Sequence, residues 1–346
     1  MTNQTPDFTP SPNAPDVAPL SEIREAMSGK PGGYVGQAGS SDVASGVSDD
    51  RAKSESAGSE AERNGPRNAL VIGSGYLGAQ LLRELGRTGW KATGITLSKS
   101  SADALRNEGL EVVAADLRTA DLRVLTENNP SVVIHCASSG KGDAGAYREI
   151  FLETTARLIK ERTFEHLIFT SSTSVYAQAD GSLVTETDPA EPERETGKVL
   201  RETEELVLAH RGTVLRLAGI YGPGRCVPLE KLLSGEAVIE GDGERIINSI
   251  HRDDAVSALY LAASHRYQGI LNVADNVPVT QLEWFQWVSR LLGRPLPPFA
   301  PRNLNRKRAW TSKKVSNAKL RSLGWSPKFP SFREGVADML NEQERG

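Results

Sequence analysis

Cysteine is nearly absent from this chain of 346 residues, which contains only Cys136 and Cys226. Each lies in an apolar or glycine-rich context. Two isolated thiols do not form a disulfide framework, and reduced cysteines are typical of cytosolic proteins. The five histidines also lack the close Cys/His spacing of a zinc site. The sequence therefore predicts a cytoplasmic protein with no structural disulfide and no protein-bound metal ion.

Long apolar runs and a strong excess of one charge are absent as well. No stretch approaches the roughly 18 uninterrupted apolar residues of a membrane span. The net charge of -3 divides into -5 for residues 1–65, with 5 basic and 10 acidic residues, and +2 for the remainder, with 36 basic and 34 acidic residues. Neither part has the basic surface typical of nucleic-acid binding. We expect a small-molecule partner, and neither a membrane nor a nucleic acid.

Residues 1–65 contain few aromatic residues and are rich in Ser, Gly, Ala, Pro and Asp. Such a composition cannot bury enough apolar surface to offset the entropy lost on ordering the chain. The start, MTNQTPDFTP, has neither the basic residues nor the apolar run of a secretory signal. We predict a disordered tail. A short helix at residues 21–27 could bind a partner, or this segment could be a solvated linker without a specific role.

The stretch at residues 68–78, NALVIGSGYLG, joins a short apolar run to a glycine-rich turn. In a dinucleotide-binding motif the first glycine permits the tight turn, the second lets a diphosphate approach the backbone, and the third lets the helix pack on the strand. A glycine-rich turn also arises for purely structural reasons, but a helix pattern and a second apolar strand follow at the spacing of a βαβ unit. The predicted phosphate-binding residues are Gly73, Gly75, Tyr76, Leu77 and Gly78.

After this motif, apolar segments alternate with helix-like segments. Strand candidates occur at residues 69–72, 92–97, 111–115, 131–136, 167–171, 213–218 and 269–273. This alternation predicts an α/β fold with a Rossmann-type, doubly wound parallel sheet. We place an NAD(P)-binding domain at 66–225 and a small, mainly substrate-binding C-terminal part at 226–346, from which the strand near 269–273 returns to the sheet. Helices are expected at 280–292, 312–323 and 332–341.

The residues after the second strand indicate which nicotinamide cofactor binds. They read Thr96-Leu97-Ser98-Lys99-Ser100, without a carboxylate before Asp103. An acidic side chain here usually binds the ribose of NAD, whereas basic or small polar groups accommodate the extra phosphate of NADP. Ser98 and Lys99 therefore favour NADP, with NAD possible, although Lys99 could be an ordinary solvated loop residue.

Two further strand ends carry candidate cofactor contacts. Asp116 and Leu117 follow the third strand, where the carboxylate could accept a hydrogen bond from an adenine amino group or cap the next helix. The fourth strand ends in a loop of small residues that includes Ala137. Such a loop suits the close approach of a cofactor, and it is equally suited to a tight turn.

Five motifs occur together in a fixed order. They are the glycine motif, Asp116-Leu117, the SSTSVY stretch at 171–176, Arg216 with YGPG at 221–224, and HRDD at 251–254. On these motifs the chain resembles the extended short-chain dehydrogenase/reductase superfamily, the NAD-dependent epimerase/dehydratase group, over about residues 68–340. The resemblance implies a Rossmann fold, a nicotinamide cofactor and, as in many similar proteins, a homodimer formed through two helices.

In that family a Ser or Thr after the fifth strand and a Tyr-x-x-x-Lys on the next helix form the catalytic set. By resemblance, Ser172 matches the serine, Thr173 is its possible substitute, and Lys198 matches the lysine that also holds the nicotinamide ribose. The residue four positions before Lys198 is Arg194 and not tyrosine. The usual proton donor is therefore expected to be missing, as in atypical members of the superfamily.

Three explanations of the chemistry follow. Another acid, such as Tyr176, Tyr221 or a water held by Lys198, could complete a reduction, although Tyr176 could equally be structural. The cofactor could instead be a structural ligand or a redox signal, or the protein could be an unorthodox isomerase or lyase.

Four residues are candidate substrate contacts. Arg194 could clamp an anionic substrate. Tyr221 and Arg225 belong to a loop that in the family lies over the nicotinamide, although YGPG is also a common turn. Arg245 matches a family arginine that contacts substrate phosphate.

These features predict an NAD(P)-binding, atypical short-chain dehydrogenase/reductase-like protein. As an enzyme it would be an oxidoreductase or epimerase acting on a small carbonyl or sugar-derived substrate. The alternative is a non-catalytic NAD(P)-binding regulator or scaffold.

Overall fold

The computed structural model describes residues 67–127, 129–140, 142–161, 164–302 and 311–343. The described residues all belong to one compact unit, Gly58–Gly346. The predicted tail at 1–65 and its possible helix at 21–27 lie outside the described residues.

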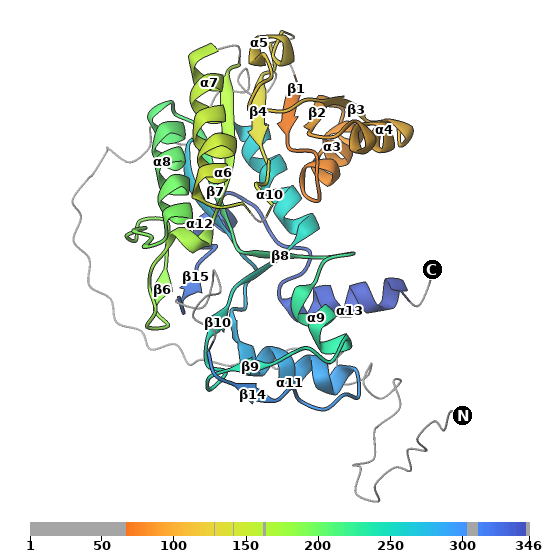
Figure 1. Cartoon of the computed structure of the whole chain (residues 1–346), viewed down its shortest axis with the longest axis vertical. Coiled ribbons are helices and arrows are strands. Elements are labelled where there is room, and N and C mark those ends of the chain that lie inside the picture. Colours follow the sequence, from red (N-terminus) through yellow and green to blue (C-terminus); the bar gives the residue numbers. More distant parts are fainter. Residues whose placement is uncertain (1–66, 128, 141, 162–163, 303–310, 344–346) are drawn as a thin grey trace, which may run out of the picture. The chain divides into compact units, whose positions relative to one another are not determined.

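A sheet of seven parallel strands forms the centre of this unit (Figure 1). In spatial order the strands are β12 (Gly269–Val273), β7 (Thr213–Leu217), β5 (His166–Ser172), β4 (Val132–His135), β1 (Asn68–Ile72), β2 (Lys91–Thr96) and β3 (Glu111–Ala114). The central strands are nearly continuous apolar runs, as expected for a sheet covered on both faces. The predicted doubly wound parallel sheet is confirmed.

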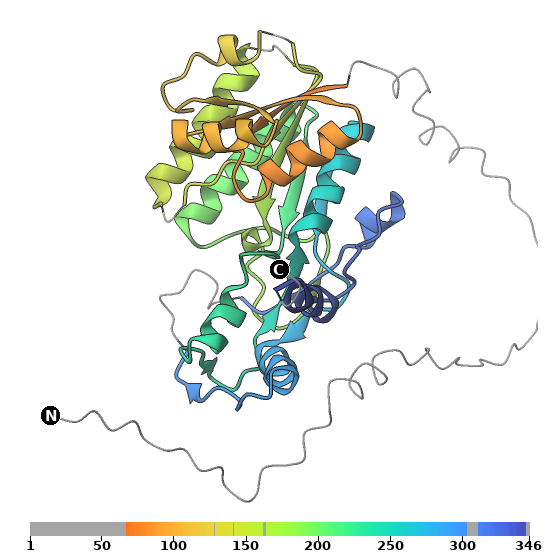
Figure 2. The ribbon, with the colours of Figure 1, turned by 90° about the vertical axis from the view of Figure 1, so that its right-hand side faces the viewer.

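Helices cover both faces of the sheet (Figures 1 and 2). On one face α3 (Gly78–Arg87) packs beside α10 (Arg252–His265), and on the other α7 (Thr154–Glu161) packs beside α8 (Glu195–Ala209). The remaining helices of this part are α4 (Lys99–Asn107), α5 (Leu122–Leu125), α6 (Ala144–Tyr147), the π-helix η1 (Arg148–Glu153) and the 3₁₀ turn η2 (Thr173–Val175). Helix α6, η1 and α7 follow one another without a break, so a π-helical segment interrupts one long helix.

A second, smaller hydrophobic core lies among α9 (Val227–Leu233), α11 (Gln281–Leu291) and α13 (Phe332–Gln343). At its centre the rings of Trp284 and Phe332 stack with centroids 5.6 Å apart. Helix α11 begins at a capping box in which Thr280 and Glu283 satisfy each other's backbone amides. Strands β9 (Ile239–Glu240) and β14 (Phe299–Ala300) pair beside this core.

Three further two-stranded pairs lie outside the central sheet. They are β6 (Leu183–Val184) with β15 (Lys314–Val315), β8 (Gly219–Tyr221) with β11 (Ser249–His251), and β10 (Ile246–Ile247) with β13 (Val279–Thr280). The helix expected at 312–323 is shorter than predicted, because Lys314–Val315 pairs as a strand and α12 spans only Ala318–Ser322. Val315 is buried in the main core, which favours the extended pairing over a helical turn.

Within the described ranges, no helix combines the length and the apolar character needed to cross a bilayer. The same part of the chain contains no group of three His, Cys, Asp or Glu side chains arranged to hold a metal ion.

Candidate functional site

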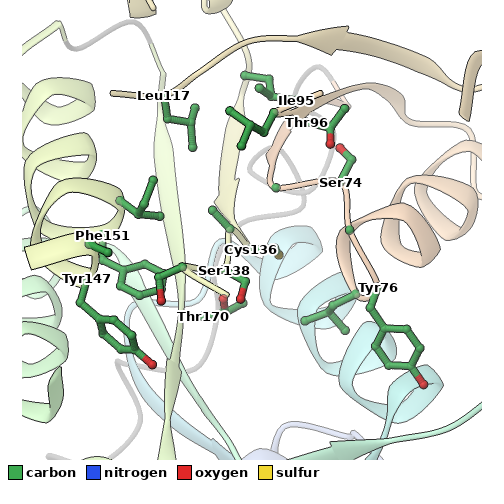
Figure 3. Close-up of a pocket in the computed structure, with 18 of the residues that line it drawn as sticks. Ser74, Tyr76, Ile95, Thr96, Leu117, Cys136, Ser138, Tyr147, Phe151 and Thr170 are labelled. Atoms are coloured by element: carbon green, nitrogen blue, oxygen red, sulfur yellow. The ribbon is translucent and has the colours of Figure 1, made fainter. Parts of the chain in front are cut away.

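A cavity of about 610 Å³ opens at the carboxyl ends of β1, β2, β4 and β5. We call it the glycine-loop cavity. It is lined by the turn at 73–77, the strand ends at 95–97, 115–118 and 136–139, the end of β5 at 170–172, and the helical residues Ala146, Tyr147, Glu149, Ile150 and Phe151. Figure 3 shows Tyr147 and Phe151 on one side, Tyr76 on the other, and Cys136, Ser138 and Thr170 between them. A crevice at this edge is where open α/β sheets bind their ligands.

The glycine turn has one packed side and one open side. Gly73 has a φ of +91°, and a Cβ there would lie 2.3 Å from the Cα of Ala137. At Gly75, in contrast, a Cβ would meet no atom within 4 Å. The amides of Gly73 and Ser74 donate to the carbonyl of Ile95, whereas those of Gly75 and Tyr76 have no acceptor among the described residues. Open space and available amides at the start of α3 fit a diphosphate.

Gly78 has a packing role, because a Cβ at this position would lie 2.2 Å from the carbonyl oxygen of Gly73. Helix α3 therefore begins directly against the turn, and Gly78 does not line the cavity.

The end of β2 reaches the cavity through Thr96 and Leu97. Ser98 and Lys99, the predicted NADP contacts, lie just beyond the lining residues. The Ser98 hydroxyl caps α4 by accepting from the amide of Ser101 at 3.1 Å, and Lys99 is the first residue of that helix. The described residues thus place no carboxylate at this strand end.

Asp116 lines the cavity together with Leu117, and Arg118 holds its carboxylate. Two hydrogen bonds, from Nε of Arg118 to Oδ1 at 2.9 Å and from Nη2 to Oδ2 at 2.7 Å, lower the pKa of Asp116. Asp116 also accepts from the Arg118 amide, so it forms a turn and does not cap a helix. The next helix, α5, is capped by Asp121.

A second cavity of about 660 Å³ adjoins the first, and we call it the adjacent cavity. Three residues, Tyr147, Ser172 and Leu200, line both cavities. The predicted residues Thr173, Arg194 and Arg245 line only the adjacent cavity, as does Lys313. Lys313 is 5% exposed, and its Nζ donates to the carbonyl of Tyr176 at 2.9 Å.

Helix α8 turns Lys198 away from both cavities. Its Nζ lies 2.7 Å from Oε1 of Glu195, and the Lys198 side chain is 52% exposed. The inward face of α8 carries Thr196, Gly197 and Leu200, which line the adjacent cavity. Successive residues of a helix are rotated by about 100°, so Lys198, one residue after Gly197 and two before Leu200, points away from that face. Its position does not support contact with a nicotinamide ribose.

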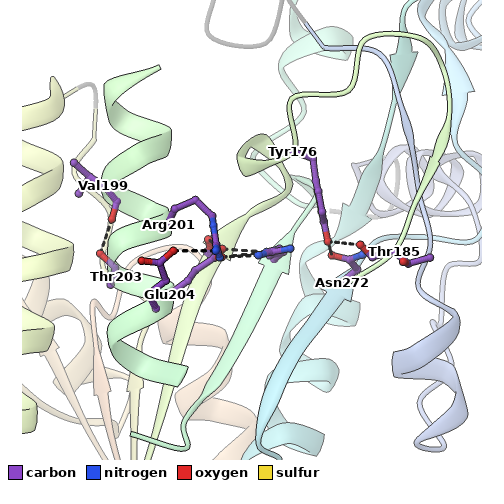
Figure 4. A network of polar contacts seen from close by, with 10 residues as sticks. Tyr176, Thr185, Val199, Arg201, Thr203, Glu204 and Asn272 are labelled. Atoms are coloured by element: carbon purple, nitrogen blue, oxygen red, sulfur yellow. Dashed lines mark hydrogen bonds and ion pairs between the residues drawn. The ribbon is translucent and has the colours of Figure 1, made fainter. Parts of the chain in front are cut away.

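A buried ion pair fixes this rotation of α8 (Figure 4). Arg216 on β7 donates from Nη2 to Oε2 of Glu204 at 2.7 Å, and both side chains are almost fully buried. Glu204 lies four residues after Leu200, one turn further along the same face. The carboxylate thus anchors the face of α8 that carries Leu200 towards the sheet.

Tyr176 belongs to the same network and lines neither the glycine-loop cavity nor the adjacent cavity. Its ring lies under the Arg216 guanidinium at 4.7 Å, and its hydroxyl is 2.8 Å from Oδ1 of Asn272 and 2.9 Å from the carbonyl of Thr185. Burial raises the pKa of Tyr176. This geometry supports a structural role and not proton donation to a substrate.

Tyr221 and Arg225, predicted together as substrate contacts, are separated by the structure. Tyr221 is buried in the smaller core, where its hydroxyl is 3.4 Å from the carbonyl of Ser331 and burial raises its pKa. Arg225 lines the glycine-loop cavity and not the adjacent one. Its location indicates contact with the ligand of the glycine loop.

Tyr147 was missed by reasoning from the sequence. It lies where α6 meets the π-helix η1, and π-helical segments are frequent at functional sites. No short motif marks this residue in the sequence. The inward face of α8 could have been found from the sequence, because the buried residues recur at helical spacing and exclude Lys198. They are Gly197, Val199, Leu200, Thr203, Glu204 and Val207.

A doubly wound parallel sheet with a glycine turn and a cavity at its carboxyl edge defines a Rossmann-type dinucleotide-binding protein. Residues 69–274 match the family model of the NAD dependent epimerase/dehydratase family, and the chain belongs to this family.

The chain is also similar to known proteins in sequence and in structure. The chain is 30% identical to Protein YeeZ of Escherichia coli over 247 residues, covering 67% of this chain and 86% of the relative. It is 30% identical to a 3-diazoavenalumate denitrifying reductase of a Streptomyces species over 305 residues, covering 77% of this chain and 98% of the relative. Among solved structures, MoeE5 in complex with UDP-glucuronic acid and NAD superimposes with a TM-score of 0.68 at 26% identity, covering 80% of this chain and 99% of that one.

Proposed function

We propose that the glycine-loop cavity binds a nicotinamide dinucleotide and that the protein is an oxidoreductase or epimerase acting on a small carbonyl or sugar-derived substrate. The observation that carries the proposal is the open side of the glycine turn, where Gly75 faces free space and two amides lack acceptors among the described residues. The reductase relative and MoeE5, whose structure contains a UDP-sugar and NAD, support the same class of chemistry.

The substrate is proposed to occupy the adjacent cavity, with its reacting oxygen at the junction of the two cavities. When bound, the nicotinamide supplies or accepts a hydride. Ser172 and Tyr147 are the hydroxyl-bearing residues that line both cavities. We assign Ser172 to orient the substrate oxygen and Tyr147 to exchange a proton with it. Thr173, which lines only the adjacent cavity, is the neighbouring hydroxyl.

The Tyr-x-x-x-Lys pair of the family is proposed to be absent from this chain. On the face of α8 that lines the adjacent cavity, the two residues with the four-residue spacing of this pair are Thr196 and Leu200. A threonine hydroxyl is a much weaker acid than a phenol, and leucine carries no charge. Proton transfer would then depend on Tyr147, from a different helix.

The substrate is proposed to be anionic. Arg194, Arg245 and Lys313 line the adjacent cavity, where Glu193 is the acidic lining residue. Three cations and one carboxylate give this wall a net positive charge. Arginine side chains bind carboxylate and phosphate groups through paired hydrogen bonds.

The cofactor is proposed to be NADP in preference to NAD. The support is the end of β2, where Leu97 lines the cavity and is followed by Ser98 and Lys99 instead of an acidic residue. The carboxylate of Asp116, at the end of the neighbouring strand β3, is held by Arg118. Titration with NADPH and with NADH, followed by cofactor fluorescence, measures the preference. A tighter dissociation constant for NADH would refute it.

Gly75→Asp tests the central assignment. The new carboxylate would enter the open space at the turn and repel a diphosphate, so we expect NADPH affinity to fall about a hundredfold. Gly86→Asp is the matched control, because Gly86 is exposed on α3, the helix that follows the turn, and a Cβ there also meets no atom within 4 Å. Equal NADPH binding by both variants would contradict the proposal.

A second candidate function is a non-catalytic NAD(P)-binding regulator. The observation in its favour is the inward face of α8, where Thr196 and Leu200 occupy the cavity wall. Oxidation of NADPH in the presence of small ketones and aldehydes that carry a carboxylate or phosphate separates the two. Turnover abolished by Ser172→Ala supports an enzyme, whereas tight binding without turnover of any of these compounds supports a regulator.

A cytoplasmic location and a homodimer are also proposed. The two cysteines are free thiols, which suits a reducing compartment, and the dimer rests on the family resemblance. Light scattering on the purified full chain measures its mass, and a monomer would reject the dimer.

A further inference from the structure

Arg225 is held at the edge of the glycine-loop cavity by a tight turn. The amide of Gly222 donates to the carbonyl of Arg225 at 3.0 Å, and the amide of Arg225 donates back to Gly222 at 2.9 Å. This turn follows β8, far in sequence from the glycine turn. It nevertheless reaches the cavity wall, where the Arg225 guanidinium carbon lies 5.3 Å from the centre of the Tyr76 ring.

The two turns touch each other directly. A Cβ on Gly222 would lie 2.8 Å from the hydroxyl oxygen of Tyr76, so a larger residue would push the segments apart. Gly222 also has a φ of +150°, which side-chain-bearing residues rarely adopt. The ring of Tyr76 thus forms a platform between the glycine turn and Arg225. Arg252 approaches the same ring at 5.4 Å but is paired with Asp253 at 2.9 Å.

Arg225 differs from the other cation of this cavity in its partners. Arg118 is bound by Asp116 and lies 3.9 Å from Glu149, so its charge is compensated. Arg225 has no ion pair within the part of the chain that the structure describes. Of the two cations in the cavity wall, it is therefore the one whose charge remains available to a ligand.

We propose that Arg225 binds the diphosphate of the dinucleotide from a second wall of the cavity, with Tyr76 holding its guanidinium in place. This inference rests on the proposed cofactor binding. The start of a helix carries only about half an elementary charge, whereas a diphosphate carries two negative charges. A guanidinium adds a full positive charge and two parallel donors for phosphate oxygens. The sequence had suggested Arg225 as a substrate contact, and the structure assigns it to the cofactor instead.

Arg225→Gln and Arg225→Lys, in the full chain, test this assignment. The probes are NADPH and ADP-ribose, which contain a diphosphate, and adenosine, which has no phosphate. We expect Arg225→Gln to bind NADPH and ADP-ribose about tenfold more weakly and adenosine within about twofold of the original protein. Arg225→Lys should recover part of the loss, and the salt dependence of NADPH binding should be shallower in Arg225→Gln.

Arg290→Gln is the matched control, because Arg290 is exposed on α11 and, within the described part of the chain, its side chain donates to the carbonyl of Gln286 alone. NADPH binding by Arg225→Gln that equals that of this control would overturn the inference. An equal loss for adenosine and for NADPH would also overturn it, since a distorted pocket weakens both. If the original protein binds none of the three probes, the proposed cofactor site fails and this inference fails with it.

Discussion

Replacing Arg216 with Met should destabilise the protein less than replacing Glu204 with Leu, because the two buried charges keep different partners. Glu204 has 0% of its side chain exposed, and Arg216 has 2%. Without Arg216, the carboxylate still receives the guanidinium of Arg201 and the hydroxyl of Ser171. Without Glu204, Arg216 keeps only its contact with the Tyr176 ring among the described residues.

The magnitudes follow from the cost of leaving one charge of a buried pair uncompensated, which is about 3–5 kcal/mol. We expect a loss of about 4 kcal/mol for Glu204→Leu and about 2–3 kcal/mol for Arg216→Met, because Arg201 compensates part of the charge in the second case. The double variant removes both charges. It should lose about 1–2 kcal/mol, less than either single variant.

Urea unfolding followed by tryptophan fluorescence measures these free energies. Arg83→Met is the matched control, because Arg83 pairs with Glu108 at the surface and the two side chains are 41% and 49% exposed. The free energy of unfolding of Arg83→Met should fall by less than about 1 kcal/mol. Additive losses in the double variant, or equal losses for Arg216→Met and Arg83→Met, would refute the reasoning.

Three further outcomes are expected. Lys198→Met should leave the dissociation constant of NADPH within about twofold, since Lys198 pairs with Glu195 at the surface; a tenfold loss would place it at the cofactor. Burial lowers the pKa of His166 to about 4, so its contribution to stability is complete above pH 6.5 and declines as the pH falls towards 4. Urea titrations at pH 7 and 4.5 should show a smaller decline for His166→Gln, and an unchanged decline would contradict this assignment. Burial raises the pKa of Cys136 to about 12, so iodoacetamide at pH 8 should alkylate it about a hundredfold more slowly than a free thiol, as peptide mass spectrometry would show.

The fold could be predicted from the sequence because local signals and tertiary packing agree. The run at Ala69–Ile72 is apolar without interruption, as a strand covered on both faces requires, and Gly73 is needed for the turn that follows. The prediction of a helix over 312–323 was wrong in part, because local signals and tertiary packing differ there. There Val315 joins a short strand pair, and such a two-residue pairing leaves no periodic signal in the sequence.

The candidate site was only partly predictable. The turn from Gly73 to Leu77 could be located because its glycines and the following helix form a local pattern. Lys198 was matched from the sequence to the lysine of the family, but the rotation of helix α8 is set by Glu204, whose partner Arg216 lies on strand β7. Tyr147 lines both cavities from the last residue of α6, directly before the π-helical segment η1, and no residue pattern in the sequence predicts that backbone feature.

Amide hydrogen exchange of the full chain with and without saturating NADPH tests the central claim most directly. If the dinucleotide occupies the glycine-loop cavity, the segments at 73–77, 115–118 and 136–139 should gain protection together, because all three line that cavity. The exposed surface of α11 lines neither cavity and should not change. Protection confined to segments outside the cavity wall, or no change at 73–77 at saturating NADPH, would contradict the assignment of this cavity as the dinucleotide site.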